Sequence, residues 1–279
     1  MKLSSGVSIG QFVPGESVIH SLDPRCKILC IFILMAGPFL ASNPAGFVPM
    51  AVYLALLCRL SEIKIRTVLR SGRPIVFLVA FTAVLNLFWT PGNELFRLGP
   101  LRITEEGVTL ALAMGLRLYF LVMFASMLMM TTSPMAFASG VESILSPLAR
   151  LRVPVSEIAM MMTIALRFIP TLFEETDRIL KAQISRGADF ESGGMLKRAR
   201  SYIPVLVPLF VLVFARAENL ATAMESRCYV PGLPRTRLNP LVWRVSDTAA
   251  LACASVFVLL SVLWGRYAGL VISKCLGLL

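Results

Sequence analysis

The chain reads AQISRG at residues 182–187 and, 41 residues later, AMESRC at residues 223–228. At this shift identical or similar residues coincide: Asp177 with Glu218, Ile179 with Leu220, Ala182 with Ala223, Ser185 with Ser226 and Arg186 with Arg227. Each stretch ends a long helical pattern with an arginine. The repetition predicts two copies of one docking device, each placed at the end of a helix.

The composition is that of an integral membrane protein. Of the 279 residues, 57% are hydrophobic and only 15% are charged, whereas about a quarter are charged in a typical soluble domain. The formal net charge of +11 is explained by Lys and Arg in cytoplasmic loops. We therefore expect the lipid bilayer, and no nucleic acid, as the partner of this basic chain.

Apolar runs mark the candidate membrane spans at residues 28–41, 45–60, 74–90, 107–132 and 248–265. A membrane-spanning helix needs about 20 apolar residues, so the first two runs are the shortest candidates. Asp23 is a suitable N-cap and Pro24 a suitable first-turn residue for the first run. The sequence therefore predicts an all-α integral membrane protein with about five transmembrane helices.

The loop after the second run orients these helices. It holds only Glu62 as an acidic residue against five basic ones: Arg59, Lys64, Arg66, Arg70 and Arg73. Since Lys and Arg are retained on the cytoplasmic side, this loop and the N-terminus are predicted to be cytoplasmic, and the loop from Pro91 external. The predicted parts are then residues 1–132 with the first four spans, a cytoplasmic region at 133–244, and residues 245–279 with the last span.

The cytoplasmic region has the pattern of amphipathic helices. We expect helices at 133–146, at 154–187 with Gly187 as the stop, and from about 195 to 227. In the second, apolar residues recur at steps of three and four: Ile158, Met161, Met162, Ala165, Phe168, Leu172, Ile179 and Ile184. Three prolines inside the last two helices are expected to bend them: Pro170, Pro204 and Pro208.

Motifs for chemistry are missing from the sequence. It contains no GxxxxGK[ST] phosphate loop, no HExxH and no GxSxG. His20 is the only histidine, and none of the six cysteines forms a CxxC pair. We therefore predict no catalytic residue, no metal site and no bound cofactor.

The two arginines have a plain structural interpretation and a functional one. A basic residue is favoured by the dipole at the end of any helix, and Gly187 is an ordinary residue to follow it. Two copies on one side of the membrane instead favour docking, because the guanidinium fork holds carboxylates and carbonyls in fixed geometry. The small Ser185 and Ser226 let each helix end approach a partner closely.

Several motifs along the chain together resemble one family. They are PGES at residues 14–17, HSLDPRCK at 20–27, LRFIP at 166–170, KAQ at 181–183 and AMESR at 223–227. The chain resembles the transmembrane T component of energy-coupling factor transporters, which is related to CbiQ-type cobalt permeases. These transporters are ABC-class importers of vitamins and metal ions in the cytoplasmic membrane of bacteria or archaea.

The resemblance implies a non-catalytic coupling subunit. Its partners are two ABC-type ATPases, identical or different, which bind the ATP, and a small membrane S component that binds the substrate. The implied ATPase-docking residues are Ser185, Arg186, Gly187, Ser226, Arg227 and Cys228, with Ala182, Ala223, Pro170 and Arg167 supporting the helices. The signatures of the family have Ala where Ser185 and Ser226 stand, and Gly where Cys228 stands. Because a residue with a Cβ disfavours left-handed backbone, we expect the second helix to end differently from the first or to continue further.

Other functions remain open on the residues alone. A stand-alone permease with its own substrate path needs several polar residues within the spans, and Arg117 and Asn86 are the main ones seen. A conventional ABC permease usually carries an EAA-Gly coupling loop, which is missing. A membrane enzyme is disfavoured by the missing motifs. For Arg117 two interpretations stand: a charge satisfied by neighbouring helices or the interface, or a structural role within the family.

Overall fold

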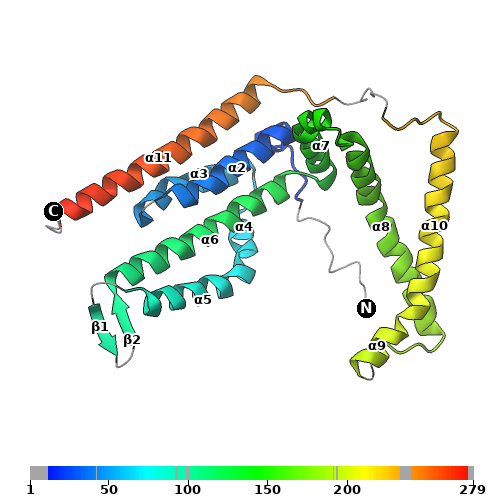
Figure 1. Cartoon of the computed structure of the whole chain (residues 1–279), viewed down its shortest axis with the longest axis horizontal. Coiled ribbons are helices and arrows are strands. Elements are labelled where there is room, and N and C mark those ends of the chain that lie inside the picture. The colour runs from blue at the N-terminus through cyan, green and yellow to red at the C-terminus, as the bar shows by residue number, and fades with distance from the viewer. Residues whose placement is uncertain are drawn as a thin grey trace. The chain divides into compact units, whose positions relative to one another are not determined.

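The computed structural model describes residues 12–41, 43–91, 94–98, 101–190, 192, 194–232 and 240–275 (Figure 1). Its elements are, in chain order, α1 (Val18–Ser21), α2 (Pro24–Leu40), a 3-10 turn η2 (Pro44–Gly46), α3 (Phe47–Leu60), α4 (Ile65–Ser71), α5 (Arg73–Trp89), β1 (Glu94–Leu98), β2 (Leu101–Thr104), α6 (Glu105–Thr131), α7 (Pro134–Leu145), a 3-10 turn η3 (Ser146–Leu151), α8 (Val155–Ser185), α9 (Met195–Ser201), α10 (Ile203–Glu225) and α11 (Val245–Cys275). The predicted helical fold is confirmed. Residues 1–11, at the start of the first predicted part, lie outside the described residues.

The chain forms two compact units. The bundle unit comprises residues 10–141 and 240–279, and the arm unit contains residues 142–239. The boundary between them therefore falls within α7, after residue 141, whereas the predicted boundary follows residue 132.

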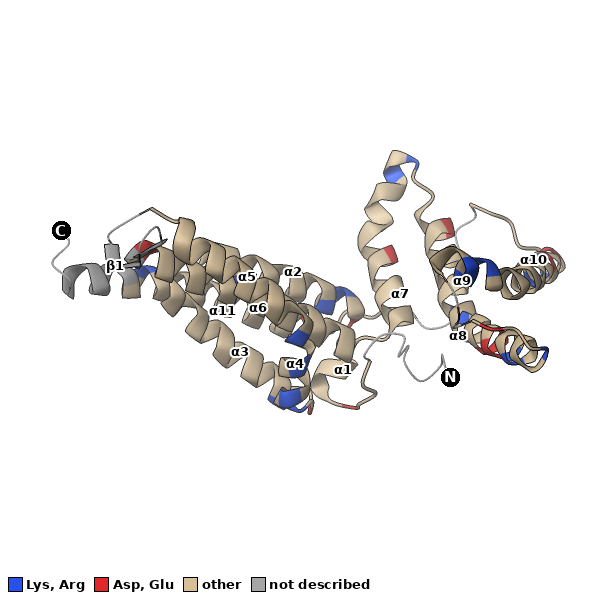
Figure 2. Cartoon of the chain, turned by 90° about the horizontal axis from the view of Figure 1, so that it is seen from below, with Lys and Arg blue, Asp and Glu red and all other residues tan. Residues whose placement is uncertain are grey.

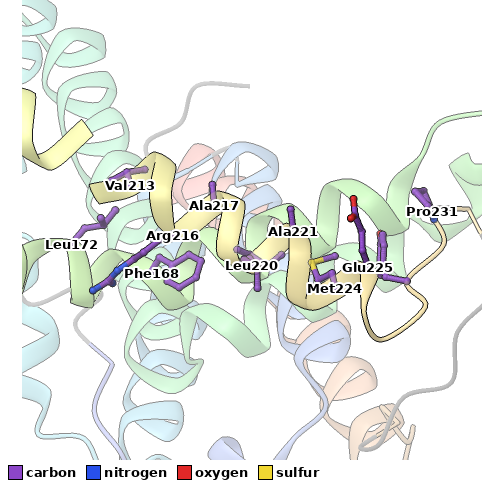
Figure 3. Close-up of a pocket in the computed structure, with 12 residues that line it drawn as sticks. Phe168, Leu172, Val213, Arg216, Ala217, Leu220, Ala221, Met224, Glu225 and Pro231 are labelled. Atoms are coloured by element: carbon purple, nitrogen blue, oxygen red, sulfur yellow. The ribbon is translucent and has the colours of Figure 1, made fainter. Parts of the chain in front are cut away.

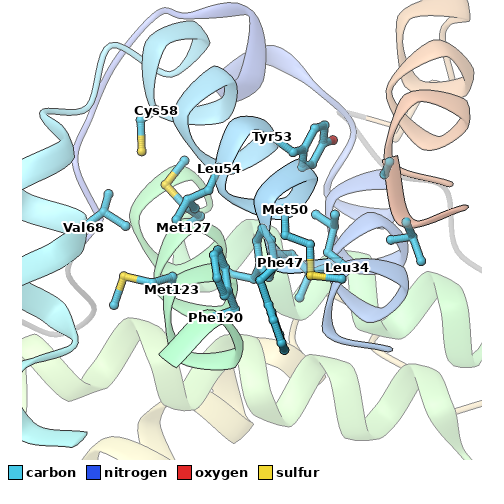
Figure 4. Close-up of a cluster of buried hydrophobic side chains, with 14 of the residues drawn as sticks. Leu34, Phe47, Met50, Tyr53, Leu54, Cys58, Val68, Phe120, Met123 and Met127 are labelled. Atoms are coloured by element: carbon cyan, nitrogen blue, oxygen red, sulfur yellow. The ribbon is translucent and has the colours of Figure 1, made fainter. Parts of the chain in front are cut away.

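The bundle unit packs α2, α3, α5, α6 and α11 together. α6 contacts α2, α3, α4 and α5, while α11 lies against α2 and α3. The core is built around the fully buried Phe124 and Met123 of α6. Phe47 stacks on Phe120 with ring centroids 5.8 Å apart, and methionine side chains fill the gaps around them (Figure 4). Since lipid offers no hydrophobic driving force between helices, this close packing is what holds them together.

Polar contacts gather the start of α2, the end of α6 and the start of α11 at one end of the bundle. The buried Lys27 ammonium donates to the carbonyls of His20 at 2.9 Å and Thr131 at 3.0 Å. The buried carboxylate of Asp247 accepts from the backbone N–H of Asp23 at 2.8 Å. These buried polar groups are satisfied by hydrogen bonds, as burial requires, so the helix ends are fixed to one another.

The predicted start of the first span is confirmed. Asp23 is the N-cap of α2, and its carboxylate accepts from the backbone N–H of Arg25 at 2.9 Å. Pro24 occupies the first turn, where its missing N–H costs nothing.

Arg117 is satisfied by a neighbouring helix. Its Nε donates to the carbonyl of Pro38 in α2 at 3.0 Å. Its guanidinium also lies 5.3 Å from the centroid of the Phe39 ring, within the range of a cation–π contact. The charge inside α6 therefore caps the end of α2, which agrees with the first of the two interpretations given above.

A short β-hairpin was not predicted. The external loop expected from Pro91 contains β1 and β2, which pair antiparallel from Glu94 opposite Thr104 to Leu98 opposite Leu101. Thr104 ends the hairpin and caps α6, because its hydroxyl oxygen accepts from the backbone N–H of Gly107 at 3.1 Å. Strands this short carry little periodicity, so the mixed charge of the segment concealed them.

Several helices are long and apolar enough to cross a membrane. Among the described residues these are 106–131, 155–185, 195–225 and 245–268, together with α4 and α5 as one span bent by 56°. The chain is therefore a multi-pass membrane protein. Residues 44–60 form a shorter apolar helix, in line with the short second run of the sequence. Two of the long helices lie in the region that was predicted to be cytoplasmic.

The helices predicted at 133–146 and 154–187 are confirmed as α7 and α8, but the third is interrupted. It consists of α9 and α10, separated at Tyr202. Pro204 lies in the first turn of α10, where proline starts a helix, because it lacks the N–H that an interior position needs. The expected bend at Pro204 is thus a break, whereas Pro170 and Pro208 lie inside their helices.

Candidate docking site on the arm unit

The longest helices of the arm unit, α8 and α10, form an antiparallel pair (Figure 1). Arg216 of α10 donates to Glu175 of α8 at 3.2 Å. Nearer the α9 end of the pair, the Gln183 amide lies 3.5 Å from the carbonyl of Pro204. The two helices therefore run antiparallel, and their C-terminal ends lie at opposite ends of the pair.

The ion pair joins equivalent positions of the internal repeat. Glu175 and Arg216 are separated by 41 residues, which is also the separation of Arg186 from Arg227. Arg186 follows Glu175 by 11 residues, and Arg227 follows Arg216 by 11 residues. Because the helices are antiparallel, the two arginines lie on opposite sides of the ion pair along the helix axes. At about 1.5 Å per residue, the two arginines lie on the order of 30 Å apart.

The first helix end is closed by a Schellman turn. The N–H of Gly187 donates to the carbonyl of Ile184 at 2.9 Å, and the N–H of Ala188 donates to the carbonyl of Gln183 at 3.0 Å. Gly187 has φ +86°, a left-handed conformation that glycine adopts without steric cost. The predicted stop at Gly187 is confirmed.

The second helix end is closed in the same way, and the expectation of a different ending was wrong. The N–H of Cys228 donates to the carbonyl of Glu225 at 2.9 Å, and that of Tyr229 to the carbonyl of Met224 at 3.0 Å. Cys228 itself adopts φ +56°. The two hydrogen bonds of the turn outweigh the steric cost of a Cβ in left-handed backbone, which is about 1–2 kcal/mol.

Both arginines therefore have the same local position, directly before the left-handed residue. Arg186 and Arg227 are exposed, and neither guanidinium has an ion-pair or hydrogen-bond partner among the described residues. The hydroxyls of Ser185 and Ser226 donate back into their own helices, each at 3.0 Å. We call residues 185–187 the first tip and residues 226–228 the second tip. The charge of the arginine at each tip is thus available to a partner, while the small serine beside it keeps the helix end narrow.

The supporting residues are placed differently. Ala182 and Ala223 are exposed one turn before the arginines, where small side chains leave room beside each tip. Arg167 and Pro170 lie in α8 at about 29 Å and 24 Å from Arg186 along the helix. The structure therefore does not bring these two residues to the first tip.

An apolar groove lies between α8 and α10 (Figure 3). It has a volume of about 500 Å³ and is lined mainly by Phe168, Leu172, Leu220 and Met224. Arg216 also lines it, so the ion pair to Glu175 borders the groove. The pattern of α8 predicted the apolar lining, but the sequence did not reveal that a groove separates the helices.

The outer face of α10 is apolar and exposed. Its residues recur at steps of three and four: Ile203, Leu206, Val207, Phe210, Val211 and Phe214. Phe214, with 70% of its surface exposed, lies two residues before the ion-paired Arg216. Contiguous exposed apolar surface of this kind marks contact with a membrane or a protein.

The ion pair was missed at the level of sequence. The signal for it was present, since Glu175 and Arg216 have opposite charge and coincide at the same shift of 41 residues. An internal repeat whose equivalent positions carry opposite charges can pair about a local two-fold axis. For metals, no group of three His, Cys, Asp or Glu side chains within the described ranges could hold an ion.

Comparisons with known proteins agree on one family. Residues 15–238 match the family model of CbiQ, described as a cobalt transport protein. The chain is 55% identical to the energy-coupling factor transporter transmembrane protein EcfT of Thermanaerovibrio acidaminovorans, over 92% of this chain and 96% of the relative. It is 47% identical to EcfT of Ruminiclostridium cellulolyticum, over 90% and 94% of the two chains. It is 40% identical to EcfT of Bacillus subtilis, over 92% and 96%.

Proposed function

The chain belongs to the CbiQ family of cobalt transport proteins and is the transmembrane component of an energy-coupling factor transporter, and from this membership we propose that it couples two cytoplasmic ATPases to substrate uptake. The ATPases bind and hydrolyse ATP, while this chain holds no cofactor and catalyses no reaction. A small membrane S component binds the cargo, a vitamin or a metal ion. The complex resides in the bacterial or archaeal cytoplasmic membrane.

The arrangement of the two tips supports this role. Arg186 and Arg227 are exposed, share one local geometry and lie on the order of 30 Å apart. This separation suits two globular subunits, each receiving one tip. Each arginine enters an acidic or carbonyl-lined groove on its ATPase, where its planar fork sets the orientation of the helix end.

The direction of the arm follows from the antiparallel pairing. If α8 and α10 crossed the bilayer, the tips at their opposite ends would face opposite sides of it. Both ATPases are cytoplasmic, so we place the helix pair along the cytoplasmic face instead. Closure of the ATPases then moves the two tips relative to one another, with the Glu175–Arg216 contact between them.

The exposed apolar face of α10 supplies the contact with the S component. It presents aromatic and branched side chains without charge from Ile203 to Phe214, and an apolar face of this kind permits sliding. When the tips move, the helices carry that motion to the S component, which then releases its cargo inside.

The polar residues inside the spans support coupling over a permease path. Arg117 donates to the carbonyl of Pro38, and the Asn86 amide donates to the carbonyl of Thr82 at 2.8 Å in its own helix. Both side chains are used for structure. A stand-alone permease would need such groups to face a substrate path.

The observation that carries the proposal is the repeated, exposed arginine at each helix end, without an ion-pair partner in the part of the chain that the structure describes. We expect Arg186→Glu to abolish uptake and to weaken ATPase co-purification, because removing one partner of a buried charge pair costs about 2–5 kcal/mol. The measurement is uptake in cells together with the ATPase yield in a mild-detergent pull-down.

The matched control is Arg150→Glu, an equal charge change at an exposed arginine outside both helix ends. It is expected to retain uptake and both ATPases. Normal uptake and normal ATPase recovery with Arg186→Glu, in protein that inserts at the normal level, contradicts the docking role.

A further inference from the structure

The turn between α3 and α5 carries a dense group of exposed basic side chains. They form what we call the basic rim: Arg59, Lys64, Arg66, Arg70 and Arg73, all exposed and without an ion-pair partner among the described residues. Figure 2 shows basic residues at and around α4, at one end of the bundle. Five positive charges with only Glu62 as an acidic residue among them repel one another, so the rim is suited to binding an anionic partner.

The rim rests on a rigid base. Val68, on the inner side of α4, is 0% exposed and belongs to the core. The turn that follows fits closely against α6, because a Cβ at Gly72 would lie 2.6 Å from Met123 Cε and 2.9 Å from Tyr119 Cε2. α4 is therefore part of the packed bundle and presents its charges from a defined position.

The faces of α4 follow the order of a membrane interface. Ile65 and Leu69, one turn apart, are 47% and 42% exposed. Arg66 and Arg70 form the adjacent stripe, displaced by about 100° around the helix axis. Around the axis of α4, the buried face is thus followed by an apolar exposed face and then by a basic face. A helix that lies between acyl chains and headgroups has the same order of faces.

The neighbouring helices place this surface at headgroup depth. α5 exposes Phe77 to 80% and also exposes Phe81 directly beyond the rim, while α3 exposes Leu56 just before the rim and Leu60 next to Arg59. These side chains belong in the hydrocarbon layer. Because the rim lies where both apolar surfaces end, its charges lie at the level of the phosphates.

We propose that α4 and the basic rim form a binding surface for the headgroups of anionic phospholipids. The recognised chemistry is a phosphate diester without a compensating positive charge, held by Arg forks and Lys ammonium groups. Ile65 and Leu69 contact the upper acyl chains of the same lipids. The bound lipid anchors the bend between α4 and α5, and this role is independent of the ATPase tips.

The test uses the purified full-length chain in an uncharged detergent and native mass spectrometry. Dioctanoyl phosphatidylglycerol, dioctanoyl phosphatidylcholine and inorganic phosphate are titrated separately. We expect retention of phosphatidylglycerol alone, and a loss of about fivefold in its affinity for each charge removed, or about 25-fold for Arg66→Gln with Arg70→Gln. Thermal unfolding checks that this exposed double variant folds normally.

The matched control removes two exposed positive charges elsewhere, by Arg150→Gln with Lys181→Gln, and is expected to bind phosphatidylglycerol normally. Equal losses in both double variants, or equal binding of the two lipids, overturn the proposal in favour of general charge attraction. Binding of inorganic phosphate as tight as that of phosphatidylglycerol overturns it in favour of a soluble anion. If Arg66→Gln with Arg70→Gln leaves lipid binding unchanged but lowers the ATPase yield in the mild-detergent pull-down, the proposal is overturned in favour of a protein partner.

Discussion

At the scale of single residues, the two tips differ at one informative position. Gly187 and Cys228 hold the same left-handed place in the same hydrogen-bonded turn. Glycine adopts that conformation without cost, while cysteine brings its Cβ close to the following carbonyl oxygen. Substitutions at the position directly after each arginine therefore measure how much the left-handed turn contributes to stability.

We expect Cys228→Gly to stabilise the second tip. Relief of the Cβ contact is worth about 1 kcal/mol, partly offset by the greater freedom of glycine in the unfolded chain. The variant should raise the thermal unfolding midpoint of the purified protein slightly and keep its ATPase co-purification unchanged.

The opposite change at the first tip is the control. Gly187→Ala places a Cβ at φ +86° and should lower the unfolding midpoint. A fall in the midpoint with Cys228→Gly would contradict the view that the turn strains Cys228.

At the scale of elements, α8 and α10 are joined by an ion pair at equivalent repeat positions. Glu175 and Arg216 are 15% and 33% exposed and lie 3.2 Å apart, so the contact is partly shielded from water. Arg178 lies 3.6 Å from the same carboxylate but is 78% exposed. Arg178 and Glu175 both belong to α8, so of the two contacts only the Glu175–Arg216 pair joins the helices, and its partial burial makes it the stronger one.

A double-mutant cycle measures this contact. We expect Glu175→Gln and Arg216→Gln to show a coupling of about 1 kcal/mol in stability, because removing either charge leaves the other without its partner on the opposite helix. Each single variant should also reduce uptake, since the tips lose their fixed relation. The cycle is measured by thermal unfolding in detergent.

Arg178→Gln serves as the control, with little change in stability expected for an exposed pair. Strictly additive effects of Glu175→Gln and Arg216→Gln would show that the ion pair does not join the helices.

At the scale of the whole molecule, the antiparallel pair sets a condition on the membrane topology. α8 and residues 195–225 are long and apolar enough to span a bilayer, yet spanning would separate the two tips. The proposed function requires both tips on one side. Their accessibility from each side of the membrane therefore distinguishes the two arrangements.

We expect both tips to react from the cytoplasmic side only. Cys228 is exposed and serves as a natural probe of the second tip. Ser185→Cys, made together with Cys228→Ser, probes the first. A membrane-impermeant maleimide should label both in inside-out vesicles and neither in right-side-out vesicles.

Cys228→Ser alone supplies the background from the other cysteines. Labelling of the two tips from opposite sides would place α8 and α10 across the bilayer and end the two-ATPase proposal.

The sequence predicted the elements better than their pairing. The cap at Asp23, the stop at Gly187 and the extent of α8 all depend on neighbours within a few residues, and all are confirmed. The hairpin at residues 94–104 and the break at Tyr202 were missed, because short strands and first-turn prolines leave only weak local signals. The ending at Cys228 was wrong since two hydrogen bonds outweighed a steric preference.

By itself, the sequence determined that this is a helical membrane protein with a repeated arginine-tipped helix, because apolar runs, caps and the 41-residue echo are properties of neighbouring residues. Only the tertiary structure decided that the two helices run antiparallel, that Glu175 meets Arg216, and that the tips point to opposite ends of the pair. The physical reason is that a sequence repeat specifies two similar helices but not the relative orientation in which they pack. The same two helices could pack parallel or antiparallel until the short connection between them and the contacts between their side faces select one arrangement.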